Sequence, residues 1–189
     1  PAAWLASQPH LTFTSGQQTL TLMQPTSTFF VYALGLLAVG IGIHAWRNWQ
    51  DERTRRWWGV ALIFWGAGAL LAGTSYEGLS YHFKCAGRDF CLWTNWWEIG
   101  YLLLSAASIN AMILAQAYSC TNGRFRRWMM GYGLFNMGLY ITAVFTGAFV
   151  PIKFLISFEF LILVTAPSIV GFTILNGWRY WRLRQRMDL

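Results

Sequence analysis

The chain contains five long apolar stretches, and this feature limits its possible folds more than any other. They cover residues 29–49, 57–83, 91–119, 127–149 and 152–178. A helix needs about 20 apolar residues to cross a hydrocarbon core about 30 Å thick, because it rises about 1.5 Å per residue. Each stretch reaches that length. The sequence therefore predicts an all-α integral membrane helical bundle with five transmembrane helices.

The composition supports a membrane protein. Of the 189 residues, 56% are hydrophobic and 11% are charged, whereas a soluble domain has about 25% charged residues. A net charge of +7 would suggest nucleic acid as the partner of a soluble protein. Here the arginines adjoin apolar stretches, where membrane orientation and anionic lipids account for them better. We expect membrane lipids as partners and no nucleic acid.

The basic residues predict the orientation. Three of them, Lys84, Arg88 and Lys153, fall at one side of the five stretches. The other side carries Arg47, Arg53, Arg55, Arg56, Arg124, Arg126, Arg127, Arg179, Arg182, Arg184 and Arg186. Basic residues concentrate on the cytoplasmic side of membrane proteins. The prediction is an external N-terminus and a cytoplasmic C-terminus, in the bacterial inner membrane.

Three parts follow from this topology: an external leader, 1–26, a transmembrane domain, 27–181, and a basic cytoplasmic tail, 182–189. In the leader, apolar residues alternate with polar ones on both sides of a glycine-containing turn. This pattern predicts a β-hairpin with one apolar face, made by Leu11, Phe13, Leu20 and Leu22. An isolated hairpin is marginal in water, so we expect it to lie on the helices or on a partner. A disordered leader is the alternative.

Two cysteines, Cys85 and Cys91, lie six residues apart in the external loop after the second stretch. In an oxidising compartment they can form a disulfide that joins the second helix to the third. Two separate thiols are the alternative.

Three glutamates interrupt the apolar stretches: Glu77, Glu98 and Glu159. Each lies six or seven residues from the external end of its stretch, which predicts a common depth of roughly 10 Å. An ionised carboxylate facing lipid costs about 2.5–3.5 kcal/mol, so all three are expected to point inward and toward one another. Such a cluster would hold protons, bind a cation or accept hydrogen bonds.

Other polar residues recur at helical spacing beside these glutamates. On the third stretch Thr94, Glu98, Tyr101, Ser105 and Ser108 predict a polar stripe. Further candidates for a cavity that binds a substrate or a cation are Ser80, His82 and Asn136. Two structural alternatives remain. Polar side chains can simply join neighbouring helices by hydrogen bonds, and each glutamate can pair locally with Lys84, Arg88 or Lys153.

Metal and retinal chemistry find little support in the sequence. His44 and His82 lie at opposite membrane ends in the predicted topology, so they cannot share a metal or a haem. Lys84 and Lys153 are not at mid-helix, so no buried amine is expected to form a retinal Schiff base. The sequence identifies no cofactor and predicts no metal site.

The run from Gly73 to Leu79, with Leu92-Trp93 and Ile99-Gly100, resembles uncharacterised bacterial multi-span proteins that carry a Gly-Thr-Tyr-His-Gly-Phe element. Glu77 stands where that element has histidine. Alkaline-ceramidase-like and sterol-isomerase-like patterns are incomplete. The ceramidase-like pattern needs a serine at the position of Gly78 and a pair of histidines after His82, and the chain has neither. The sterol-isomerase-like pattern needs a histidine at the position of Gly73.

The sequence contains no complete catalytic constellation, but it has 12 Trp, 14 Phe and 8 Tyr. We expect a polytopic membrane subunit or binding protein, which packs against partner membrane chains, lipids or pigments. The alternative is an enzyme or carrier for an amphiphilic or cationic substrate that uses the glutamates.

Overall fold

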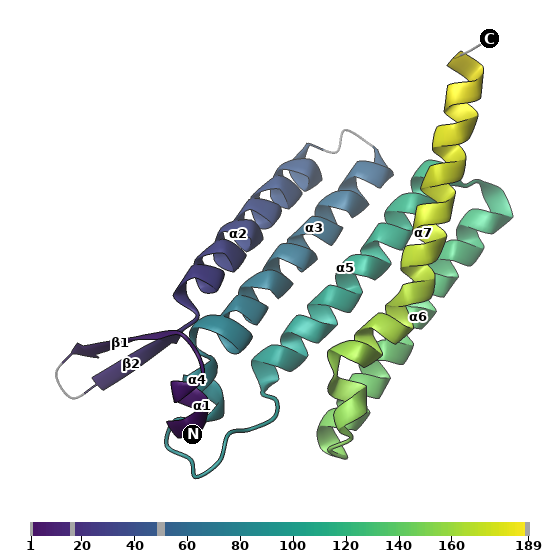
Figure 1. Ribbon diagram of the computed structural model, residues 1–189. Coiled ribbons are helices and arrows are strands. Elements are labelled where there is room, and N and C mark those ends of the chain that lie inside the picture. The colour runs from purple at the N-terminus through teal and green to yellow at the C-terminus, as the bar shows by residue number, and fades with distance from the viewer. Residues whose placement is uncertain (1, 16–17, 49–51, 188–189) are drawn as a thin grey trace.

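The computed structural model describes residues 2–15, 18–48 and 52–187. Five long helices run alternately up and down, and a short hairpin projects from the start of the first of them (Figure 1). In chain order the elements are α1 (Ala2–Ala6), β1 (His10–Ser15), β2 (Gln18–Met23), α2 (Pro25–Arg47), α3 (Arg53–Ala72), the π-helix η1 (Gly73–Gly78), α4 (Ser80–Lys84), α5 (Trp96–Cys120), α6 (Gly123–Phe149), the 3₁₀-helix η2 (Lys153–Ile156) and α7 (Phe158–Met187).

Four helical segments of the described chain are long and apolar enough to cross a membrane. They are Pro25–Arg47, Arg53–Gly78, Trp96–Cys120 and Phe158–Arg182. Five such segments were predicted, and four of them are confirmed as long and apolar enough. The remaining helix, α6, has 27 residues but does not join this group.

The bundle has two distinct ends. We call the end with the hairpin, α4 and η2 the hairpin end, and the end with the α2–α3 and α5–α6 connections the arginine end (Figure 1). The helix turns that adjoin these two connections and the last turns of α7 carry most of the basic residues. The alternating helix directions thus bring together arginines that are far apart in the sequence.

Several predicted boundaries were wrong. Residues 91–95 are not helical, and α5 begins only after Asn95, whose Oδ1 accepts a hydrogen bond from the Glu98 N–H at 3.0 Å. The last helix begins at Phe158 rather than near residue 152, because η2 precedes it. Helix α7 also continues to Met187, through most of the predicted tail. In addition, the leader contains the short helix α1.

The predicted hairpin is confirmed. In its register Leu11 faces Leu22 and Phe13 faces Leu20, so the four apolar residues share one face as expected. This chain's described helices leave most of that face uncovered, since Leu11, Phe13 and Leu20 are 48%, 54% and 45% exposed. The other half of the expectation, that a partner covers it, stays a prediction. On the other face Thr21 and Met23 are buried, near η1 and α4.

Helices α2 and α3 approach closely through glycines. A Cβ at Gly42 would lie 2.8 Å from the Gly59 carbonyl oxygen, and one at Gly35 would lie 3.0 Å from that of Gly66. Small residues on apolar helices permit close contact, which the sequence predicts for Gly35, Gly40, Gly42, Gly66, Gly68 and Gly73. The α2–α3 contact is present at Gly35, Gly42 and Gly66, whereas a Cβ at Gly40 would meet no atom within 4 Å.

Helix α5 lies in the centre, in contact with α3 on one side and with α6 and α7 on the other. Leu102 and Ala106 of α5 are fully buried against Tyr140 and Val144 of α6. The Ser108 hydroxyl donates to the Ala61 carbonyl of α3 at 2.9 Å. The core of the bundle is therefore built around α5.

Candidate functional site at the hairpin end

A change of helix type places the first candidate residues. After Ala72 the third helix widens into the six-residue π-helix η1, where the Leu79 N–H donates to the Thr74 carbonyl five residues earlier. Thr74 also meets α2, because its Oγ1 lies 2.5 Å from the hydroxyl of Tyr32. Short π segments within α-helices occur frequently at functional sites. This one carries Tyr76 and Glu77.

A buried ion pair lies beside this segment. Glu98, in the first turn of α5, is 1% exposed, and its Oε1 lies 2.5 Å from the Nζ of Lys84 at the end of α4. Burying a lone carboxylate is costly, and the ammonium offsets that cost. The start of a helix also favours negative charge. Glu98 is therefore a compensated charge, which agrees with the local pairing considered from the sequence.

Two tyrosine rings border the ion pair. The Lys84 ammonium lies 5.0 Å from the centroid of the Tyr76 ring, within the range of a cation–π interaction. The Tyr76 ring meets the Tyr101 ring edge to face, with centroids 5.8 Å apart. Tyr101 follows Glu98 by three residues on α5, so both side chains lie on one face of that helix.

Glu77 is the carboxylate without a compensating partner. Its Oε2 is buried and has no hydrogen-bond partner among the described residues. The residue lines a cavity of about 320 Å³ together with Tyr76, Tyr101 and Phe158, which come from η1, α5 and α7. This volume is at the lower end for small-molecule pockets, roughly 300–1,000 Å³. The cavity therefore combines aromatic walls with a carboxylate that still needs a donor or a cation.

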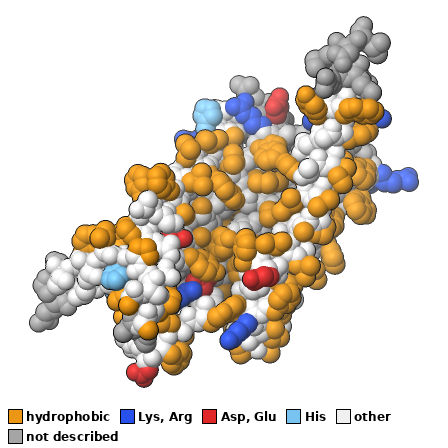
Figure 2. Space-filling view, in the orientation of Figure 1, with side chains coloured by type: hydrophobic (Ala, Val, Ile, Leu, Met, Phe, Trp, Pro, Cys, Tyr) orange, Lys and Arg blue, Asp and Glu red, His pale blue; other side chains and the backbone are white. Residues whose placement is uncertain are grey.

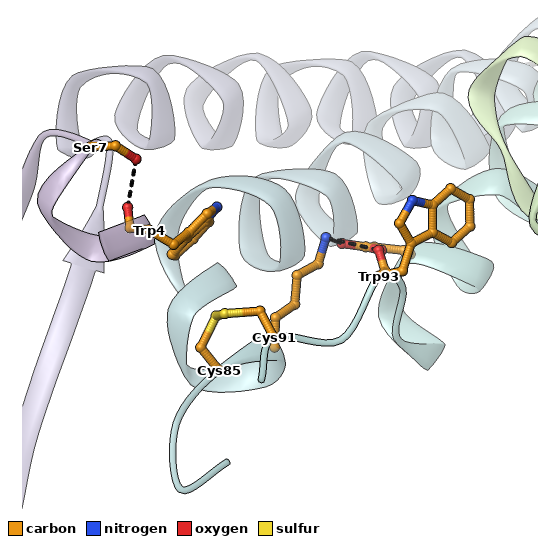
Figure 3. The surroundings of a disulfide bond; sticks show 7 residues. Trp4, Ser7, Cys85, Cys91 and Trp93 are labelled. Carbon is orange, nitrogen blue, oxygen red and sulfur yellow. Dashed lines mark hydrogen bonds and ion pairs between the residues drawn. A yellow bond between two sulfur atoms is a disulfide. The ribbon is translucent and has the colours of Figure 1, made fainter. Parts of the chain in front are cut away.

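The predicted disulfide between Cys85 and Cys91 is present, with an S–S distance of 2.07 Å (Figure 3). It closes the loop that begins directly after Lys84, and the residues on either side of the loop are joined as well, because the Leu92 N–H donates to the Lys84 carbonyl at 2.9 Å. Trp4 of α1 lies beside the disulfide in Figure 3, and its ring stacks on that of Tyr81. The disulfide loop thus holds the end of α4 near α5.

Figure 2 shows acidic and basic side chains close together among hydrophobic ones at the hairpin end. A second cavity there, of about 500 Å³, is lined by Arg88, Lys153 and the rings of Trp93, Trp96 and Trp97. Its basic residues contrast with the carboxylate of the first cavity.

Not all sequence candidates join this group. Glu159 is in the first turn of α7 but is exposed, so the expectation that all three glutamates point inward was wrong. Glu98 and Glu159 also lie closer to the ends of their helices than predicted. Each is in the first turn of its helix, whereas the sequence placed it about two turns inside. His82 is exposed. The buried Ser80 hydroxyl donates to the Glu77 carbonyl at 2.8 Å and so stabilises the end of η1.

Asn136 lies elsewhere, between α5, α6 and α7. Its Nδ2 donates to the Val164 carbonyl at 3.2 Å, and its Oδ1 accepts from the Nδ2 of Asn110 at 3.3 Å. This arrangement matches the structural alternative, in which polar side chains join helices. The sequence did not single out Asn110, although an asparagine within an apolar stretch was an available signal.

Tyr76 was also missed, and no signal in the sequence distinguishes it from the other aromatic residues. Its role depends on η1, which turns it toward Lys84 and Tyr101. Lys84 itself was considered only as a local partner of a glutamate. In the described part of the chain, no three His, Cys, Asp or Glu residues lie close enough together to hold a metal ion.

The comparisons identify a family. The family model described as a family of unknown function, DUF6962, matches residues 26–188. The matched range includes nearly all of α2 and the helices that follow, with every residue of the Glu77 cavity, and it excludes the hairpin. No curated protein and no solved structure matches the chain.

Proposed function

The chain belongs to the family DUF6962, whose function is unknown, and we propose that it is a polytopic membrane binding protein whose Glu77 cavity takes the cationic headgroup of an amphiphile. The observation that carries this proposal is the buried, unpartnered carboxylate oxygen of Glu77 beside the rings of Tyr76 and Tyr101. Carboxylates and aromatic rings are the groups that recognise ammonium headgroups.

The charge balance of the site supports a cation as the ligand. Glu98 is neutralised by Lys84, whereas Glu77 forms no ion pair among the described residues. A cationic headgroup near Glu77 would supply the missing charge without displacing Lys84. A neutral hydrogen-bond donor would satisfy the oxygen but leave the charge.

In this proposal α6 is the fifth transmembrane helix. It has 27 residues, which extend about 40 Å at 1.5 Å per residue. No charged residue occurs from Trp128 to Ile152, and the helix lies antiparallel to α5 in the bundle (Figure 1). Its lower apolarity reflects its glycines, tyrosines and Asn136, several of which face α5 or α7.

Five spans give the N-terminus and the C-terminus opposite sides of the membrane. We place the hairpin end outside and the arginine end in the cytoplasm, because basic residues concentrate on the cytoplasmic side. A disulfide at the hairpin end agrees with an oxidising exterior. The location that fits both is the bacterial inner membrane, with the Glu77 cavity in the outer leaflet.

Lipids or partner membrane chains would cover the remaining apolar surface. Large side chains on α2, α6 and α7 are exposed, including Phe29, Phe30, Phe135 and Ile174 at 65–70%. Such surface fits a subunit of a membrane complex as well as a protein surrounded by lipid.

The test compares two glutamates, Glu77 in the cavity and Glu52 at the other end of the bundle. Purified protein in neutral detergent is titrated with an amphiphile series that shares one alkyl chain and carries an ammonium, a neutral or a sulfate headgroup. Binding is followed by tryptophan fluorescence. We expect the ammonium member to bind best and Glu77→Gln to weaken its binding at least about tenfold, which corresponds to about 1.4 kcal/mol.

Glu52→Gln is the matched control. It removes the same charge from an exposed position at the arginine end, away from the cavity, so the affinity of this variant should stay within about twofold of the wild type. Equal losses in both variants, or no preference for the ammonium headgroup, would overturn the proposal. Conversion of the added amphiphile into a product would instead support the enzyme alternative.

A further inference from the structure

The other end of the bundle, away from Glu77, also has a cavity. A groove of about 370 Å³ runs between α6 and α7 and has α5 as its floor. Its walls are almost entirely apolar and include Met129, Gly171 and Leu175. Grooves of this size between the helices of a bundle are typical places for small ligands.

One wall of the groove is a row of aromatic rings on α6. The rings of Phe125 and Trp128 stack with centroids 6.1 Å apart, and those of Trp128 and Tyr132 with centroids 6.0 Å apart. Trp128 is 65% exposed even though it lines the groove. The row therefore offers a flat apolar surface that the chain itself does not cover.

The opposite wall is unusually open. Gly171 of α7 lines the groove, and a Cβ placed on it would meet no atom within 4 Å. The contrast with Gly42, where the added atom would lie 2.8 Å from another backbone, shows that this space is not filled by the protein. An elongated apolar group can therefore lie against α7 here without any rearrangement.

Two arginines of α7, Arg179 and Arg182, lie beyond the groove toward the arginine end. Ser168, Leu175 and Arg182 follow one another at seven-residue steps, so they share one face of α7. Arg182 lies about 10 Å beyond Leu175 along the helix axis, and its guanidinium is 4.1 Å from the Trp178 ring. Arg179 also reaches this end, where it donates to the Ser119 carbonyl at 3.2 Å.

Among the described residues of α6 and α7, no carboxylate lies at this end. Between Gly123 and Arg182 the sequence contains one acidic residue, Glu159, at the opposite end of α7. Arg182 forms no ion pair among the described residues. The groove is apolar, and the arginines one to two turns beyond it form no ion pair among the described residues. This arrangement is complementary to a phospholipid with apolar acyl chains and a negatively charged headgroup.

We propose that this groove binds one acyl chain of an anionic phospholipid, with the lipid phosphate at Arg182 and Arg179. The lipid would fill the space between α6 and α7, and its headgroup would offset the charge at the end of α7. This site is independent of the Glu77 cavity, which lies at the other end of the bundle and attracts the opposite charge.

The experiment uses the full chain in nanodiscs that contain phosphatidylglycerol and phosphatidylcholine with identical acyl chains. Native mass spectrometry counts the lipids that stay bound after the disc is removed. We expect phosphatidylglycerol to be enriched at least about fivefold over its share of the disc, since each arginine near a membrane surface contributes substantially to anionic lipid binding. Arg182→Gln should remove most of the enrichment.

Two matched pairs make the result specific. Gly171→Leu should reduce the number of bound lipids, because it fills the groove. Gly177→Leu, on the same helix and equally open but outside the groove lining, should not. Arg127→Gln should keep the enrichment, because Arg127 lies two residues from both Phe125 and Met129, on another side of α6.

Three outcomes would overturn the proposal. The first is no enrichment of phosphatidylglycerol in the wild type. The second is an equal loss in Arg182→Gln and Arg127→Gln, which would indicate general surface charge. The third is unchanged lipid binding in Gly171→Leu, or a protein chain that occupies the groove in place of lipid.

Discussion

The bundle contains two helix pairs rich in glycine, and they differ sharply. Four glycines of α2 and α3, Gly35, Gly42, Gly59 and Gly66, face the partner helix, and a Cβ at Gly66 would lie 2.8 Å from the Val39 nitrogen. On α6 and α7, Gly138 and Gly171 face open space, although Gly147 packs closely on η2, and a groove of about 370 Å³ lies between the two helices beside Gly171. Similar sequence content therefore produces a closed contact in one half and a ligand-sized opening in the other.

The comparison shows where binding can occur. Where α2, α3 and α5 meet, the helices are joined by close glycine contacts and the Ser108–Ala61 hydrogen bond, and α4 is joined to α5 by the Lys84–Glu98 ion pair. The part from α6 to α7 is held by a few polar contacts and leaves apolar surface uncovered. Substitutions should therefore cost more stability in the first part than in the second.

The largest effect is expected at the ion pair. Lys84→Met would leave the Glu98 carboxylate buried without a partner, which typically costs about 3–5 kcal/mol. Thermal unfolding in detergent, followed by tryptophan fluorescence, measures the loss. Arg88→Met is the control, because it removes a charge from an exposed position in the following loop. Equal losses in the two variants would show that the pair contributes little, and Lys84→Met/Glu98→Leu should recover much of the stability.

A smaller effect, of opposite sign in the two halves, is expected for glycine substitutions. Gly66→Ala adds a methyl group within 3 Å of the α2 backbone and should destabilise by about 1–3 kcal/mol. Gly138→Ala on α6 meets no atom within 4 Å and should stabilise by up to about 1 kcal/mol through its higher helix propensity. The free energy of unfolding in mixed micelles gives both values. If both substitutions changed the free energy of unfolding in the same direction, the proposed difference between the two helix pairs would be contradicted.

The smallest effect is expected for the polar contacts that hold the open half. Asn136→Leu removes hydrogen bonds between α5, α6 and α7, each typically worth about 0.6 kcal/mol between membrane helices, so a loss of about 1 kcal/mol is expected. Thr142→Val is the control, since the Thr142 hydroxyl bonds within its own helix. A loss above about 3 kcal/mol in the same unfolding assay would mean that the open half is as tightly held as the other.

The sequence by itself determined the helical class, the approximate positions of four apolar spans and the hairpin with its apolar face, and it gave the disulfide as one of two alternatives for the cysteine pair. These features depend on local patterns. Alternation of Leu11 and Phe13 with threonines specifies a strand face, and the length of an apolar run specifies a helix that can cross a membrane. The close approach at Gly35, Gly42 and Gly66 was also predictable, because small residues on apolar helices commonly permit it.

Only the tertiary structure decided the roles of the three glutamates. The sequence treated them as equivalent, but Glu98 is paired with Lys84, Glu77 is left with an unpartnered oxygen, and Glu159 is exposed. These differences depend on where α5 and α7 begin and on the π-helix η1, which changes the direction of Tyr76 and Glu77. The open groove at Gly171 was equally hidden from the sequence. Whether a residue finds a partner depends on which helices lie beside it, and that is set by the packing of the whole chain rather than by local spacing.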